Sequence, residues 1–183
     1  MTSRLDTHMQ LPQWAIASPK RREHIGRVTT LLDGWAALMA IEPAERAAWH
    51  DAGLWHDALR DADEPLLRKL SLDERSPVEI LHGAAAAARL ESIGETRRDV
   101  LDAIRWHTLG NPDWARTGQA LFMADFLEPG RKFMVAERAW LAHMVPDDFS
   151  GVFRQVVKVR LEWSLREGKG LHRETVAMWN TVR

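Results

Sequence analysis

Helical spacing of apolar residues is the feature that most limits what this chain can fold into. Between residues 20 and 40, apolar side chains recur every three or four positions: Ile25, Val28, Leu31, Leu32, Trp35, Leu38 and Met39. This spacing places them along one face of a helix. Similar spacing returns in the later segments, and no segment has the convincing alternation of a half-buried strand. The sequence therefore predicts an all-α protein of about eight helices.

Proline, glycine and capping residues divide the chain into the expected helices. Ser18-Pro19 and Ser76-Pro77 are start signals, because serine caps a helix and proline suits its first turn. Gly94, Asn111 and Gly130 lie at expected breaks, with Asn111 as the cap of the following helix. The predicted helices cover residues 20–40, 43–60, 77–92, 95–107, 112–128, 132–144, 146–167 and 173–182, with a further short helix around 65–72.

The chain has 183 residues, which is enough for one domain with a substantial core. Residues 1–19 are predicted to be an N-terminal lead-in, and residues 20–183 a single domain, because no linker-like segment divides them. No apolar run approaches the ~18 residues of a membrane span. The first 13 residues lack the apolar core of a signal peptide, so a cytoplasmic location is expected.

Charge and cysteine content exclude several classes of protein. Lys and Arg number 25 against 26 Asp and Glu, which argues against a general nucleic-acid-binding protein with its usual basic excess. The chain has no cysteine, so disulfides, zinc–thiolate sites and cysteine nucleophiles are excluded. A metal would have to be held by His, Asp and Glu, which suits iron, manganese, zinc, cobalt or magnesium.

The pair His56-Asp57 is unusual because it lies among apolar residues of a predicted inner helix. Burying an imidazole and a carboxylate costs several kcal/mol unless something compensates. A bound cation compensates, because it keeps the carboxylate charged and the imidazole neutral. The chain has a second pair, His50-Asp51, and only the more apolar setting of His56-Asp57 favours it as the metal site.

Several titratable residues lie on apolar helical faces or at helix ends. They come from five predicted helices: His24, His56, Asp57, His82, His107 and Asp125. For any one of them, a hydrogen-bonded structural residue or a helix cap is the alternative interpretation. Helical bundles build polar sites by converging such groups from facing helices, and here the number of such groups favours a shared site.

The order His24, His56-Asp57, Asp125 resembles the H…HD…D pattern of HD-domain metal-dependent phosphohydrolases. Within that superfamily the chain is most similar to the YqeK-type symmetrical bis(5'-nucleosyl)-tetraphosphatases, which hydrolyse diadenosine tetraphosphate. The motifs that carry the resemblance lie at residues 21–28, 52–57, 81–83, 104–110 and 124–131, the last being the most specific. The resemblance spans residues 20 to 182 and selects His56-Asp57 over His50-Asp51.

The resemblance implies an HD-domain helical bundle with a metal site at its centre. One or two divalent ions are implied, with iron the first expectation and manganese or another divalent ion the alternatives. The implied metal ligands are His24, His56, Asp57 and Asp125, and a second ion would involve His82 and His107. The implied catalytic residues are Asp57, His82, His107 and Arg131. The implied substrate contacts are His24, Asp57, His82, His107, Arg131, Lys169 and His172.

The activity that the resemblance implies is attack of a metal-activated water on an inner phosphorus of a dinucleoside tetraphosphate, which releases two ADP. Arg131 suits the charge of the leaving phosphate, because a guanidinium pairs two phosphate oxygens. The alternatives are an HD-domain phosphohydrolase acting on another nucleotide and a non-catalytic nucleotide-binding HD protein. The implied partner is a small-molecule nucleotide, with neither nucleic acid nor membrane, and a monomer and a homodimer both stay open.

The chain departs from the family pattern in three places. Trp55 precedes the His-Asp pair where the family usually has an aliphatic residue, and Arg60 stands where a lysine is common. The chain also has nine Trp and no Tyr, so any tyrosine that the family uses to stack a base is absent. These changes leave the metal site intact, and they leave base recognition open.

Overall fold

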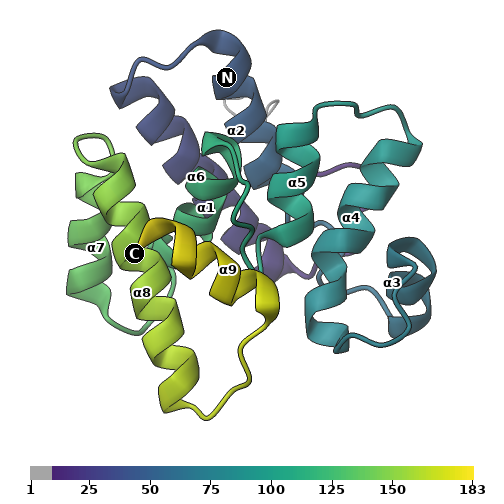
Figure 1. Cartoon of the computed structure of the whole chain (residues 1–183). Helices are drawn as coiled ribbons and strands as arrows, with labels where there is room; N and C mark the ends of the chain where they lie inside the picture. The colour runs from purple at the N-terminus through teal and green to yellow at the C-terminus, as the bar shows by residue number, and fades with distance from the viewer. Residues whose placement is uncertain (1–9) are drawn as a thin grey trace.

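The computed structural model describes residues 10–183, which form nine α-helices and one short 3-10 turn (Figure 1). The helices are α1 (Pro19–Leu38), α2 (Pro43–Trp55), α3 (Glu64–Ser71), α4 (Leu81–Ser92), α5 (Arg98–Trp106), α6 (Arg116–Leu127), α7 (Val135–Met144), α8 (Phe149–Arg166) and α9 (Arg173–Val182), and the 3-10 turn η1 is Val78–Ile80. No strand occurs in this part of the chain, which confirms the all-α prediction. The first nine residues of the predicted lead-in lie outside the described residues.

Helix α6 is the centre of the packing. It contacts α1, α2, α5, α7 and α8. Nearly every side chain from Thr117 to Leu127 is buried, and Asp125 is among the few exceptions. In Figure 1, α7 and α8 lie on one side of α6, and α3, α4 and α5 lie on the other. A polar residue on α6 is therefore surrounded by helices from both halves of the chain. No helix between residues 10 and 183 is long and apolar enough to cross a membrane.

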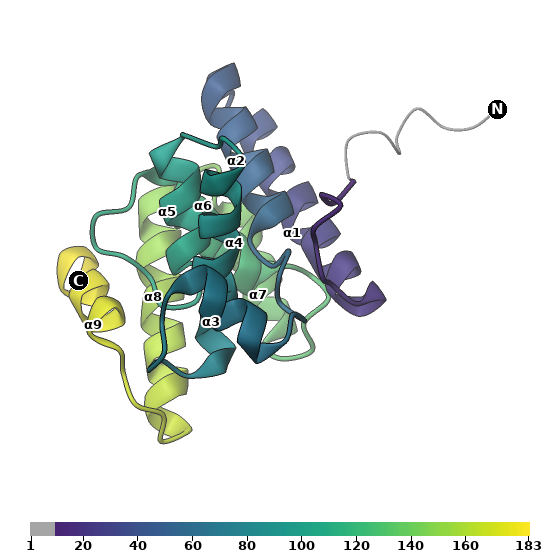
Figure 2. The same cartoon turned by 90° about the vertical axis from the view of Figure 1, so that its right-hand side faces the viewer.

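The start of α1 follows the predicted signals. Pro19 is its first residue, and the Ser18 side chain accepts a hydrogen bond from the backbone N–H of Arg21. The segment before α1 is attached to the turn after α2, because the N–H of Ile16 donates to the carbonyl of Ala58 over 2.7 Å. Figure 2 shows this segment running beside α1. The attachment brings the beginning of α1 close to the turn that carries Asp57.

The predicted starts of α4, α5, α6, α7 and α8 are three or four residues too early, and for α4 and α6 the expected capping signals do not cap the helix. Ser76-Pro77 leads into η1, so α4 begins only at Leu81. The N–H of Ser76 is held by the Asp73 carboxylate over 2.9 Å, which shapes a turn instead of a cap. The Asn111 side chain accepts from the N–H of Asp113 and does not cap a helix, so α6 begins at Arg116.

Helices α2 and α5 end in the same way, and α2 is shorter than predicted. Each is followed by a histidine whose Nδ1 donates over 2.7 Å to a carbonyl three residues back: His56 to Gly53, and His107 to Ile104. A continuing helix would use that carbonyl for the backbone N–H four residues on. The ring takes its place, so α2 stops at Trp55 and α5 at Trp106.

Candidate metal centre

His56 and His107 present the same ring nitrogen to the centre of the bundle. A carbonyl oxygen only accepts hydrogen bonds, so Nδ1 carries the proton in each of these bonds. Nε2 is therefore unprotonated, and its lone pair is available to a metal. The sequence achieves this locally, because the helix end that positions each histidine also fixes its tautomer. His56 and His107 are both fully enclosed by protein.

Asp57 lies between four imidazoles. Its Oδ1 is 3.1 Å from Nε2 of His82 and 3.4 Å from Nε2 of His107. Its Oδ2 is 3.6 Å from Nε2 of His56 and 3.7 Å from Nε2 of His24. Two triads result, His24-His56-Asp57 and Asp57-His82-His107, each with donor atoms within 4.8 Å of one another. The carboxylate of Asp57 is therefore shared by both.

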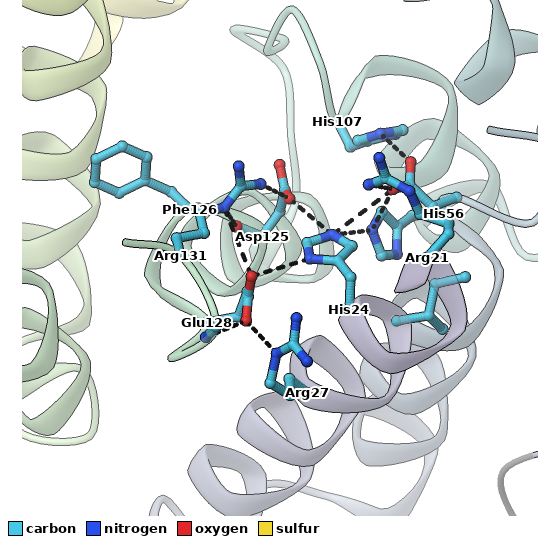
Figure 3. A network of polar contacts seen from close by, with 12 residues as sticks. Arg21, His24, Arg27, His56, His107, Asp125, Phe126, Glu128 and Arg131 are labelled. Atoms are coloured by element: carbon cyan, nitrogen blue, oxygen red, sulfur yellow. Dashed lines mark hydrogen bonds and ion pairs between the residues drawn. The ribbon is translucent and has the colours of Figure 1, made fainter. Parts of the chain in front are cut away.

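His24 on α1 is oriented by Glu128, which follows α6. Nδ1 of His24 lies 3.2 Å from Oε1 of Glu128, and this contact turns Nε2 toward the centre (Figure 3). Oε2 of Glu128 accepts from Nε of Arg27 and from the N–H of Gly130, both over 2.6 Å. A buried carboxylate that is fixed in this way holds the ring of a ligand histidine in place.

Asp125 stands beside the first triad without being part of either. Its Oδ1 is 3.2 Å from Nε2 of His24 and accepts from Nη2 of Arg131 over 2.5 Å (Figure 3). Its Oδ2 is 3.8 Å from Nη1 of Arg160. The predicted ligand set therefore comes together around His24, with Asp125 on the side that faces Arg131.

The carboxylates of the cluster are ionised at neutral pH, whereas its histidines differ in pKa. Burial opposes ionisation of Asp57, but the nearby His56 and the close contacts with His107 and His82 hold its pKa well below the usual value. Burial lowers the pKa of His56 to about 4 and also lowers that of His82. Burial also lowers the pKa of His24, but the hydrogen bonds to Asp125 and Glu128 outweigh this effect and raise the pKa to about 9.

The same pattern holds on the α6 side of the cluster. Burial raises the pKa of Asp125, but the hydrogen bond from His24 and the charges of Arg131 and Arg160 outweigh it and leave the pKa well below its usual value. Burial also raises the pKa of Glu128, but the hydrogen bonds from His24 and Arg27 outweigh this effect and lower the pKa to about 2. Both acids are therefore anionic at neutral pH.

The donor set fits a divalent metal. Nε2 atoms approach in pairs, 3.4 Å for His24 with His56 and 3.0 Å for His82 with His107, around one buried carboxylate. In the described structure Nδ1 of His82 is buried without a hydrogen-bond partner. So many buried polar atoms are costly unless a cation or a ligand compensates. Imidazole and carboxylate donors suit iron, manganese, zinc and related ions.

Not all predicted site residues join this cluster. Lys169 and His172 line a separate hollow of about 450 Å³ between α8 and α9. The alternative pair lies elsewhere: Nδ1 of His50 is 3.0 Å from Asp33, and Asp51 pairs with Arg97 over 2.7 Å. The preference for His56-Asp57 agrees with these positions.

Three contacts were not predicted from the sequence. Nη1 of Arg21 donates to Oδ2 of Asp57 over 2.6 Å, and the spacing of Arg21 one turn before His24 on α1 is a signal that indicates this. Glu128 was recognised only as part of a motif. Arg160 has no local signal, because only the packing of α8 against α6 brings it to Asp125.

Comparison with a solved structure shows which fold the chain has. The structure resembles that of a protein from Clostridium acetobutylicum described as a predicted HD superfamily hydrolase involved in NAD metabolism, with a TM-score of 0.77 and 23% identity, covering 90% of this chain and 89% of the other. The chain therefore has the fold of an HD superfamily hydrolase, which confirms the predicted fold. No family model matches the chain.

Three relatives of the chain share the name symmetrical bis(5'-nucleosyl)-tetraphosphatase. The protein of Halalkalibacterium halodurans is 25% identical over 182 residues, which cover 95% of this chain and 94% of the relative. The Bacillus subtilis protein is 23% identical over 154 residues, covering 77% and 82%. The Staphylococcus aureus protein is 44% identical over 54 residues, 29% of this chain and 28% of the relative. The predicted resemblance is confirmed, and together these findings support a phosphohydrolase.

Proposed function

We propose that the protein hydrolyses dinucleoside tetraphosphates symmetrically, so that diadenosine tetraphosphate gives two ADP. The observation that carries the proposal is the position of Asp57, which is shared by two histidine triads and accepts a hydrogen bond from Arg21, a residue of the cationic hollow that His24 also lines. The names of the relatives support the choice of substrate.

His24, His56, Asp57 and Asp125 would hold one divalent ion, for which iron is the first expectation and manganese an alternative. Asp57, His82 and His107 form the second triad and would hold a second ion. When bound, such an ion lowers the pKa of a coordinated water from 15.7 towards about 7 and supplies hydroxide at neutral pH.

The hollow beside His24 suits a polyphosphate. Its volume is about 510 Å³, and five cationic side chains line it: Lys20, Arg21, Arg27, Arg131 and Lys132. A tetraphosphate carries several negative charges, and guanidinium groups bind its oxygens with paired hydrogen bonds. Arg21 donates to Asp57, so one of these cations lies directly at the cluster.

In the proposed reaction the oxygen of water bonds to an inner phosphorus, and the bond from that phosphorus to the central bridging oxygen breaks. The leaving ADP departs on a phosphate oxygen, so neutralisation of its charge matters more than a strong acid. Arg131 suits this role, because its guanidinium lies at Asp125 and also lines the cationic hollow. Burial lowers the pKa of His82, so its imidazole is uncharged at neutral pH and adds no positive charge to the site.

Separation of the products tests the proposal. The purified protein is loaded with iron or manganese, incubated with diadenosine tetraphosphate, and the nucleotides are resolved by ion-exchange chromatography. ADP as the sole product supports symmetrical cleavage. AMP with ATP, or no turnover with any of several divalent metals, contradicts it.

A further inference from the structure

Arg160 and Trp163 lie one turn apart on α8 and separate two hollows. The first, of about 370 Å³, also includes Asp125 and Arg131 at the edge of the metal centre. The second is the hollow of about 450 Å³ that includes Lys169 and His172. Among the described residues, Arg160 and Trp163 are the two that line both hollows.

Arg160 holds an unused hydrogen-bond donor next to the metal centre. Its Nη2 donates to the carbonyl of Thr108 over 3.2 Å, and its guanidinium lies 4.1 Å from the ring centre of Phe122. Nη1 is buried and has no hydrogen-bond partner in the described structure, although it lies 3.8 Å from Oδ2 of Asp125. Buried N–H groups normally have a partner, and a phosphate oxygen is one that a guanidinium binds strongly.

Trp163 presents an aromatic surface beside this donor. The residue is 46% exposed, which is unusual for so large an apolar side chain. The ammonium of Lys169 lies 4.0 Å from its ring centre, and Lys169 lines only the second hollow, so the part of the ring in the first hollow is open to a ligand. Nucleobases stack on such surfaces, and Trp163 offers the largest aromatic ring in a hollow that Phe126 and Phe133 also line.

We propose that this face of α8 binds one nucleoside diphosphate half of the substrate. Trp163 stacks the nucleobase in the hollow of about 370 Å³, and Nη1 of Arg160 binds a phosphate beside Asp125. The inference rests on the proposed function and adds to it the residues that recognise the nucleotide. The position of α8 beside α6 in Figure 1 places this face next to the helix that carries Asp125.

Binding of ADP and of inorganic pyrophosphate to the manganese-loaded protein, measured by calorimetry, tests the two roles separately. Trp163→Ala is expected to weaken ADP binding about tenfold or more and to leave pyrophosphate binding unchanged. Arg160→Gln is expected to weaken both about tenfold. Trp163→Phe should restore most of the ADP affinity, because it restores a stacking surface.

The matched controls are Trp140→Ala, which removes an exposed tryptophan from α7, and Arg154→Gln, which removes an exposed arginine that donates to the carbonyl of Val182. Both should bind both ligands as the unchanged protein does. Thermal melting of each variant establishes that it is folded. If Arg160→Gln does not fold, Trp163→Ala decides alone.

Unchanged ADP affinity in Trp163→Ala, or equal weakening of ADP and pyrophosphate in that variant, overturns the inference. The proposed function fails in a different way. If diadenosine tetraphosphate is not cleaved to ADP while Trp163→Ala still weakens ADP selectively, the nucleotide site on α8 stands and the reaction is wrong. If ADP is the sole product and the variants bind it normally, only the inference about α8 is wrong.

Discussion

Oε1 of Glu128 lies 3.2 Å from Nδ1 of His24, and this contact determines which ring nitrogen of His24 faces the metal centre. Glu128 is buried, and its other oxygen is held by Arg27 and by the N–H of Gly130. The carboxylate thus accepts from three donors at once. This one side chain joins α1, which carries His24 and Arg27, to the turn after α6 (Figure 3).

Glu128→Gln should weaken metal binding about 10- to 100-fold, which is the usual effect of losing a partner behind a ligand histidine. An amide has one acceptor oxygen where the carboxylate has two, so His24, Arg27 and Gly130 can no longer all be satisfied. Competition with a fluorescent chelator measures the affinity. Glu137→Gln, at an exposed position on α7, is the control, and equal affinities in the two variants would contradict this role of Glu128.

The same substitution should change stability in a pH-dependent way in the metal-free protein. The pKa of Glu128 falls from 4.5 to about 2 on folding, so its ionisation stabilises the folded state fully above pH 4.5 and progressively less as pH falls towards 2. The pH-dependent part of this stabilisation is roughly 2–3 kcal/mol at pH 7. Urea unfolding in the presence of a chelator should show a large deficit for Glu128→Gln at pH 7 and a smaller one at pH 3. A deficit that is constant over this range would be inconsistent with the low pKa.

Asp57→Asn should abolish stoichiometric metal binding, because Asp57 belongs to both triads and no other carboxylate does. Asp51→Asn is the matched control, since Asp51 pairs with Arg97 away from the cluster. Metal content after dialysis, measured by elemental analysis, distinguishes the two. Retention of metal by Asp57→Asn together with its loss from Asp51→Asn would show that the wrong histidine-aspartate pair has been assigned.

Gly83→Ala should disturb the second triad. A Cβ at Gly83 would lie 2.6 Å from the carbonyl of Ile104 and 3.0 Å from Nδ1 of His107, so it competes with the bond that orients His107. The expected cost is about 1–3 kcal/mol in the free energy of unfolding, with weaker metal binding. Gly34→Ala on α1 meets nothing within 4 Å and should stabilise the protein by about 0.4–1 kcal/mol. Similar effects of the two substitutions would argue against close packing at Gly83.

Much of the fold was predictable because its signals are local. Pro19 and Ser18 fix the start of α1 through one helical turn, and the apolar spacing fixes its buried face. The end of α2 was predicted five residues too late, because the pattern of apolar residues continues past Trp55. The ring of His56 ends the helix by taking the carbonyl of Gly53, which no apolar pattern reveals.

The site was only partly predictable, for a similar reason. Spacing along a helix indicates that His24 and Arg21 share a face, but only packing brings Glu128 to His24 and Arg160 to Asp125. The resemblance chose His56-Asp57 over His50-Asp51, where residue spacing alone left both open. Lys169 and His172 line a hollow that shares Arg160 with the separate hollow at the edge of the metal centre, a relationship that depends on how α9 follows α8.

Hydrolysis of diadenosine tetraphosphate in oxygen-18 water tests the central claim most directly. The metal-loaded protein is predicted to give only ADP, with one of the two ADP molecules from each turnover carrying a single oxygen-18 atom in its β-phosphate, and no product with Asp57→Asn. Label in AMP, ATP or inorganic phosphate, undiminished turnover by Asp57→Asn, or no cleavage with any divalent metal would contradict the assignment of the Asp57 cluster as the centre of symmetrical hydrolysis.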